Sequence, residues 1–346
     1  MIDWRLAGVV AQGVAATGPS VSAEAAEPFA AVSEPTREST ELVQAYTGLV
    51  PAAPLPPPEA LDRGGWIETS LGGMRGVLDP VADRLGGDLG PFAPVVRAAG
   101  GALLALEVGA LSGALAQRVL GQYEFAVLDP SAPARLLFVA PNLAHAAGSL
   151  EAEPQALLRW VALHEVTHAL QFGAVEWLRP HLAERVRALM ADLDVTIDPS
   201  RLTRIPSGDD VRAFVDAARG GDLATFLLGD AQRAQLDELQ AFMAVLEGYA
   251  EHVMDAVGLD LLPDLPELRA AMDERRARDR TGLLRLLEKV IGLDAKLRQY
   301  EEGKRFCDAV VGFGGVAALN RVWDAPECMP SPAELSDPLG WLSRSQ

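Results

Sequence analysis

Apolar positions recur along this chain with the spacing of helices far more often than with the alternation of strands. Gly173 and Gly258 are placed to end two of the predicted helices. The fold class is therefore predicted to be mainly α with a small β-sheet (α+β). Helical patterns cover residues 4–48 (as two or three helices), 66–85, 91–123, 155–172, 232–257 and 266–323.

The clearest strand pattern is the apolar run from Arg135 to Ala140, which lies between the turn-forming residues Pro133 and Pro141. Two interpretations of this strand remain open. It could be a sheet edge, with which an extended peptide would pair through main-chain hydrogen bonds. It could equally be an ordinary core strand.

A proline-rich stretch over residues 51–65 predicts a stiff connector and is the most visible boundary in the sequence. It separates an N-terminal helical region, residues 1–50, from a larger unit, residues 66–346, and we expect both to pack as one globular body. Residues 181–230 read as an insertion or lid within the larger unit.

The most apolar segment runs from Gly101 to Leu120 and is rich in small residues. We interpret it as a buried helix that packs closely through Gly109, Gly113 and Ala114, in preference to a membrane span.

The composition argues against some classes of function. The chain carries 30 basic and 48 acidic side chains, for a formal net charge of −18, which argues against nucleic-acid and anionic-membrane partners. Cys307 and Cys328 are too few for a disulfide framework, so we expect free thiols in a reducing cytoplasm. The first residues lack the basic and apolar regions of a signal peptide, which also favours a cytoplasmic protein.

The candidate chemistry begins with the stretch His164-Glu165-Val166-Thr167-His168. On a helix, residues four apart share a face, so both imidazoles can reach one metal ion, and Glu165 can then address a water bound to it. Ser149 or Glu151 could cap this helix, and Pro154 suits its first turn. The alternative, a helix with two ordinary histidines, gives no reason for a glutamate at this position. Five apolar residues are expected to pack its other side: Leu157, Leu158, Val161, Ala162 and Leu170.

A catalytic zinc usually takes three protein ligands, so the two histidines need a third. In one class of zinc hydrolase, a glycine and a third histidine follow the second histidine at fixed spacing. Gln171 and Ala174 occupy those positions here, which excludes that class. The other common solution is a glutamate from a later helix.

Glu247, Glu251 and Asp255 follow one face of a later predicted helix at intervals of four residues. They would repel one another unless something positive lies against them, as a metal ion and a histidine N–H would. A solvated acidic stripe is the plainer alternative. Gly248 would let another backbone approach this helix closely.

This arrangement resembles the gluzincin metallopeptidases, in which HExxH is followed by a glutamate ligand and, four residues later, by an acid that supports a ligand histidine. The resemblance implies Glu247 as third zinc ligand and Glu251 as the supporting acid, with Asp255 behind it. The chain departs from thermolysin-like members in two ways: position 251, four residues after Glu247, holds Glu where those members typically have Asp, and the spacer after the HExxH motif has 78 residues. Glu251 as the ligand therefore stays open, and His252 is a weaker candidate.

Wider stretches are similar to actinobacterial zincin-like proteins annotated only as hydrolases, one branch of which is named for an association with deazaflavin coenzyme biosynthesis. This resemblance implies a zincin-like metalloprotease fold and leaves the substrate undefined. Its segments are Val119–Tyr123, Phe138–Leu143, Leu163–His168, Glu247–Asp255 and Lys296–Tyr300.

The predicted activity is zinc-assisted amide hydrolysis of a peptide or protein substrate, with Zn²⁺ as cofactor and Glu165 as general base. A second electrophile for the oxyanion would come from Tyr300, Tyr249 or His252, of which we favour Tyr300; Tyr123 is a further candidate. Two alternatives remain: a hydrolase of a small non-peptide amide, and a zinc-bearing scaffold that binds a partner without turnover.

Overall fold

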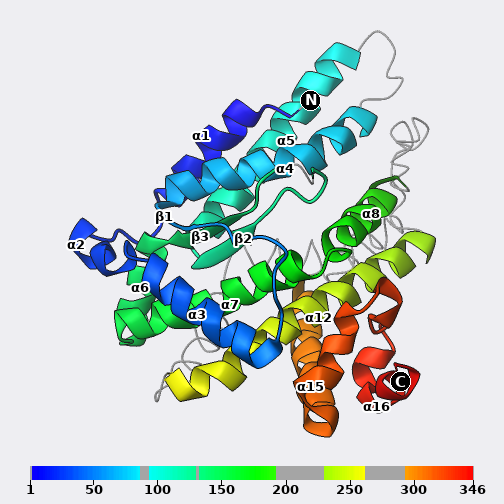
Figure 1. The fold of residues 1–346 in the computed structure, drawn as a ribbon. Helices are drawn as coiled ribbons and strands as arrows, with labels where there is room; N and C mark the ends of the chain where they lie inside the picture. Colours follow the sequence, from blue (N-terminus) through cyan, green and yellow to red (C-terminus); the bar gives the residue numbers. More distant parts are fainter. Residues whose placement is uncertain (1, 86–92, 130–131, 192–229, 262–292, 346) are drawn as a thin grey trace. The chain divides into compact units, whose positions relative to one another are not determined.

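The computed structural model describes residues 2–85, 93–129, 132–191, 230–261 and 293–345 (Figure 1). Helices dominate these residues, and their three strands form one small mixed sheet, which confirms the predicted fold class. The chain divides into two compact units. The first comprises Met1–Pro180 and Val253–Met272, and the second comprises His181–His252 and Asp273–Gln346.

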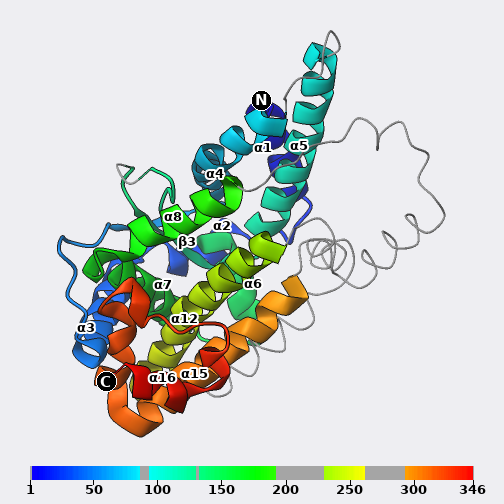
Figure 2. The same cartoon turned by 90° about the vertical axis from the view of Figure 1, so that its right-hand side faces the viewer.

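Helices α1 (Trp4–Ala15), α4 (Arg63–Leu85) and α5 (Ala93–Ala116) of the first unit lie side by side in both views of the fold (Figures 1 and 2). As predicted, α5 packs closely through its glycines. A Cβ added at Gly109 would lie 2.5 Å from the carbonyl oxygen of Ala7, and Gly113 lies equally close to Ala11. The two helices therefore meet backbone to backbone.

The opposite face of α5 is open, which differs from the prediction of a buried helix. Leu103 is 58% exposed and Leu106 is 46% exposed. By length and composition, one stretch within the described residues, Ala98–Ala116, could cross a membrane, and 28% of its window is buried.

The remaining N-terminal elements are the short helices α2 (Ala23–Ala26) and η1 (Glu27–Phe29) and the longer α3 (Ser33–Thr47). The prediction of two or three helices before residue 48 is confirmed. Helix α3 packs on the helix that carries the histidine pair, and Glu38 forms a 3.1 Å ion pair with Arg159 there.

The sheet has the strand order β1 (Pro58–Leu61), β3 (Arg135–Val139), β2 (Gly121–Glu124). β1 is parallel to β3, and β2 is antiparallel to it. β3 is thus the central strand, and residues 136–139 are at most 1% exposed. The core-strand interpretation of this segment is confirmed and the sheet-edge interpretation is wrong.

The two outer strands were not predicted. β1 lies at the end of the proline-rich connector, and proline at the first residue of an outer strand removes no donor that the ladder needs. β2 lies where the helix over residues 91–123 was expected to continue, but α5 ends at Ala116. Both strands have four residues, too few for a clear alternation, and their pairing with β3 determines their conformation.

Helix α6 (Ala140–Leu150) follows β3 directly, and α7 (Pro154–Ala174) carries the histidine pair. The N-cap of α7 is Glu153, whose carboxylate accepts from the N–H groups of Gln155 and Ala156; the predicted caps Ser149 and Glu151 are wrong. Pro154 occupies the first turn, as predicted. α7 packs against α3, α6, β2 and β3, so it lies at the centre of the first unit, and the five predicted core residues are all buried.

Helix α8 (Leu178–Ala191) begins in the first unit and continues from His181 in the second. It is the described part of the predicted insertion or lid, and residues 192–229 lie outside the described residues. Helix α12 (Asp230–Leu261) runs through Gly258, so the predicted stop there is wrong; it contributes to both units. Of the helices predicted over 266–323, α15 (Leu293–Leu319) is described, and residues 262–292 are not. Four short helices complete the C-terminal region: η3 (Asn320–Trp323), η4 (Pro326–Cys328), η5 (Glu334–Ser336) and α16 (Pro338–Arg344).

Both cysteines are free, as predicted, with Cys307 buried in α15 and Cys328 partly buried in η4. Burial raises the pKa of the Cys307 thiol well above its ordinary value. This thiol therefore behaves as a small apolar core group.

Candidate metal centre

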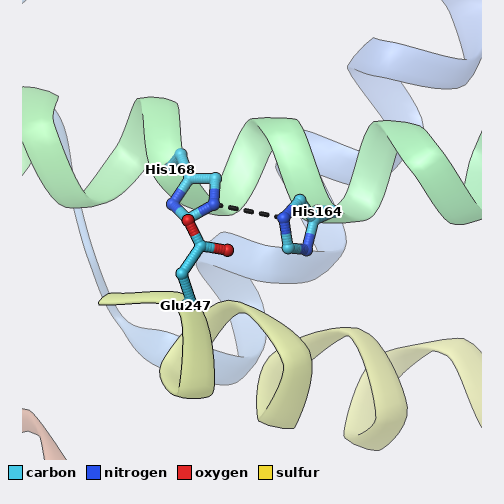
Figure 3. A group of neighbouring side chains, drawn as sticks. All are labelled: His164, His168 and Glu247. Carbon is cyan, nitrogen blue, oxygen red and sulfur yellow. Dashed lines mark hydrogen bonds between the residues drawn. The ribbon is translucent and has the colours of Figure 1, made fainter. Parts of the chain in front are cut away.

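His164 and His168 lie one turn apart on α7 and direct their imidazoles to the same side of the helix (Figure 3). Their Nε2 atoms are 3.2 Å apart, and the two rings meet edge to face with centroids 4.7 Å apart. The predicted convergence of the two side chains is therefore present in the structure.

Glu247 of α12 reaches the same point from a distant part of the sequence (Figure 3). One ligand atom from each of His164, His168 and Glu247 lies within 4.8 Å of the other two, and all three side chains are partly exposed. Two imidazole nitrogens and one carboxylate make a donor set that could hold a metal ion.

The spacing of the two nitrogens tests whether zinc fits this group. Tetrahedral zinc has Zn–N bonds of 2.0–2.1 Å and so holds two nitrogen ligands about 3.3 Å apart. The observed separation of the Nε2 atoms is 3.2 Å. The histidine pair therefore has the spacing that one zinc ion requires, and three protein ligands leave a fourth position open.

Gln171 orients the second histidine. Its side-chain oxygen lies 2.9 Å from Nδ1 of His168, and the residue is fully buried. Because an amide oxygen accepts hydrogen bonds, this contact places the proton on Nδ1 and leaves the Nε2 lone pair for a metal. In the sequence, Gln171 occupies the glycine position of the three-histidine class and was used only to exclude that class. Its spacing of three residues from His168 was the available signal for this contact.

Glu165 is held by the backbone of β2. Its Oε2 accepts a 2.8 Å hydrogen bond from the N–H of Tyr123, and the residue is 8% exposed. A Cβ added at Gly121 would lie 2.7 Å from Cγ of Glu165 and 2.8 Å from Cγ1 of Val161. Glycine at position 121 is thus what allows β2 to run so close to α7.

The register of the sheet shows which backbone groups β2 turns outward. Leu120 accepts from the N–H of Val139 at 2.9 Å, and Gln122 lies opposite Leu137, so the even-numbered residues bond to β3. In an antiparallel pair the residues between them direct their N–H and C=O groups away from the partner. Gly121 and Tyr123 therefore present theirs on the outer edge of β2, which pairs with no strand among the described residues.

The other acids stay predictions. Glu251 and Asp255 continue the face of Glu247 along α12 but are not part of the three-residue group. His252, the weaker ligand candidate, is also absent from that group, and its Nδ1 lies 2.7 Å from Asp308 of α15, which also accepts from Lys304. His252 thus joins α12 to α15.

Gly248 allows the close approach expected of it, but the approaching backbone belongs to α15. A Cβ added at Gly248 would lie 2.5 Å from the backbone nitrogen of Lys304 and closer still to Gly303. Gly248 is therefore explained by the packing of two helices, and it carries no information about a metal.

The tyrosine candidates differ in their surroundings. Tyr249 is fully buried, donates to Oδ1 of Asn320 at 2.8 Å and packs against the ring of Trp323, so it acts as a core residue. Tyr300 lies in the first turns of α15, where the side chains lie outside the described set. Tyr123 is half-buried, and burial raises the pKa of its phenol.

Comparison with known proteins gives two findings. Residues 2–342 match the model of the family described as zincin-like metallopeptidases. The fold is similar to a crystal structure from Chloroflexus aurantiacus, of a candidate hydrolase with a novel fold, at a TM-score of 0.70 and 30% sequence identity, covering 99% of this chain and 98% of that one. No curated protein matches the chain.

Proposed function

Because the chain belongs to the zincin-like metallopeptidase family, we propose that it is a zinc-dependent hydrolase and that its substrates are peptides. One observation carries the proposal: His164, His168 and Glu247 offer three ligand atoms within 4.8 Å of one another. Glu165, on the same helix, lies beside an outward-facing strand edge. This arrangement would place a metal ion, a general base and a strand edge that can bind an extended peptide next to one another.

His164, His168 and Glu247 would hold the zinc ion, with Gln171 keeping His168 in the tautomer that ligation needs. When bound, Zn²⁺ acts as a Lewis acid that makes water more acidic and polarises a substrate carbonyl. Zinc is the expected metal because two imidazoles and one carboxylate are its common catalytic ligands.

Glu165 is proposed to act as the general base. It takes a proton from the water whose oxygen attacks the amide carbon, and it returns that proton to the amine as the C–N bond breaks. The N–H of Tyr123 binds Oε2 of Glu165 and so holds the carboxylate in place beside β2. Donation from this N–H also stabilises the negative charge that a base requires.

The outer edge of β2 favours a peptide over a small amide as substrate. Gly121 turns its N–H and C=O outward beside Glu165, and Tyr123 turns its C=O outward while its N–H binds Glu165. An extended peptide could pair with this edge and place its scissile bond near the base. We therefore propose that an extended substrate pairs with the edge of β2, and not with β3, which is the central strand.

The experiment compares wild-type protein with Glu165→Gln, both loaded with zinc, on a mixture of defined peptides analysed by mass spectrometry. Wild type should release fragments, and the variant should be slower by a factor of about 10² or more, because a positioned base contributes on that scale. Zinc content should be equal in the two proteins, because Glu165 is not among the proposed ligands. Equal cleavage by both would refute the base role, and no cleavage by zinc-loaded wild type would refute the peptidase.

A further inference from the structure

Three aromatic side chains form a cluster where β2 meets the end of α7. The ring of Tyr123 lies 6.0 Å from that of Phe172 and 5.7 Å from that of Phe125, centroid to centroid. Phe125 and Phe172 are closer, at 4.5 Å. We call Tyr123, Phe125 and Phe172 the aromatic cluster.

The aromatic cluster adjoins the proposed reaction centre. Phe172 follows His168 by four residues and Glu165 by seven, so all three lie on the same face of α7. Tyr123 supplies the N–H that binds Glu165, and Gly121 on the same face of β2 lies against the Glu165 side chain. Gly121 thus lies against the proposed base, and Tyr123, two residues further along β2, belongs to the aromatic cluster.

The cluster is not part of the closed core. Tyr123, Phe125 and Phe172 are all only partly buried, whereas core aromatics such as Tyr249 and Phe306 are fully buried. These three residues therefore keep part of their surface exposed, on elements that adjoin Glu165. Surface of this kind next to a reaction centre is suited to an apolar ligand group.

Arg179 contacts the aromatic cluster at Phe125. Its guanidinium stacks 5.3 Å from the ring of Phe125 and donates to the carbonyl oxygens of Ala126, Asp129 and Ala132. The loop after β2 is thus tied to the start of α8, which limits how far Phe125 can move. A surface fixed before binding loses less entropy when a ligand arrives.

We propose that the aromatic cluster binds a large apolar side chain of the substrate peptide, adjacent to the bond that is cleaved. This inference rests on the proposed function. The N–H of Tyr123 is taken by Glu165, so a peptide would pair here by donating an N–H to the outward C=O of Tyr123. The residue that donates lies opposite Tyr123 and has its side chain on the same face as the Tyr123 ring, because directly opposed residues in a sheet share a face. That side chain then meets Phe172 and Phe125, so the cluster selects substrates by the size and apolarity of this one residue.

The test uses zinc-loaded protein and one peptide that wild type cleaves, with the residues flanking the cleaved bond varied in turn through Phe, Leu, Ala, Ser and Asp. At one position kcat/KM should be at least about tenfold higher for Phe or Leu than for Ser or Asp, since such side-chain differences are worth 10–200-fold in an apolar pocket. Phe172→Ala and the milder Phe125→Leu should reduce this preference by about fivefold or more. The matched control is Phe313→Ala, which removes an aromatic ring that is 64% exposed on α15 and should leave the preference unchanged.

Thermal unfolding and zinc content of each variant establish that it is folded and loaded, and Phe125→Leu provides a conservative change if Phe172→Ala does not fold. Cleavage by wild type without an apolar preference would overturn the aromatic-cluster proposal and leave the proposed hydrolase intact. The same conclusion holds if the preference persists unchanged in Phe172→Ala and Phe125→Leu. Absence of cleavage of any peptide by zinc-loaded wild type would instead refute the proposed peptidase, and with it this inference.

Discussion

Glu124, the last residue of β2, carries the most informative titration in the structure. Burial raises the pKa of its carboxyl from 4.5 to about 7, and donation from the Gln122 amide and the charge of Arg135 oppose this only in part. The carboxyl lies against α4, where a Cβ added at Gly73 would be 2.5 Å from Oε1. Ionisation of the Glu124 carboxyl therefore lowers the stability of the folded state.

The direction of the pH dependence follows from the raised pKa. The folded protein holds this proton more tightly than the unfolded chain, so Glu124 favours folding most below about pH 4.5 and loses that contribution as the pH rises to about 7. A difference of one pKa unit corresponds to 1.36 kcal/mol, so the interval from 4.5 to about 7 corresponds to about 3 kcal/mol of unfolding free energy. Replacement by glutamine removes the titration and keeps the shape.

The assay is urea unfolding of metal-free wild type and Glu124→Gln at pH 5, 6, 7 and 8. The variant's stability relative to wild type should increase with pH and reach about 3 kcal/mol near pH 8. Glu24→Gln, at an exposed residue of α2, is the matched control and should show no such trend. A difference between Glu124→Gln and wild type that is constant from pH 5 to pH 8 would refute the buried-carboxyl argument.

Two further predictions concern the metal. Glu247→Ala should weaken zinc binding strongly and Glu251→Ala much less, as measured by competition with a chromophoric chelator; the reverse order would move the third ligand to Glu251. Gln171→Met should weaken zinc binding by about 10–100-fold, because it removes the acceptor on Nδ1 of His168, whereas Gln171→Glu restores an acceptor and should bind nearly as tightly as wild type. Unchanged zinc affinity in Gln171→Met would contradict the orienting role, and ¹⁵N NMR of the imidazole nitrogens reports the tautomer independently of activity.

The helix that carries the histidine pair was predictable because its determinants are local. The proline-free run, the apolar side and the spacing of His164 and His168 all lie within α7. The same holds for β3, whose apolar run is both a strand and fully buried. Details at the ends were less predictable: Glu153 and not Ser149 caps α7, because several nearby side chains are able to cap and the turn geometry decides among them.

What could not be predicted depends on contacts between distant segments. β1 and β2 exist because β3 supplies their hydrogen bonds, and neither has a sufficient pattern of its own. Gly258 does not end α12, since a glycine inside a helix costs about 1 kcal/mol and packing along the helix can offset it. The contact between the Tyr123 N–H and Glu165 could not be predicted from the sequence. Every residue except proline has a backbone N–H, and only the fold determines which one faces Glu165.

The candidate site thus combines residues of one helix with groups from distant segments of the chain, and mutations that affect these two sets should have different consequences. His164, Glu165 and His168 keep their relative positions for as long as α7 is helical. Glu247 and the Tyr123 N–H reach them from α12 and β2, so changes that loosen either element act on the site without altering the histidine spacing. Gly121→Ala separates these effects, because its Cβ would displace β2 from Glu165 while leaving all three proposed zinc ligands unchanged. We therefore expect this variant to retain zinc and to lose cleavage; a loss of zinc with the loss of cleavage would mean that β2 positions the metal ligands as well as the base.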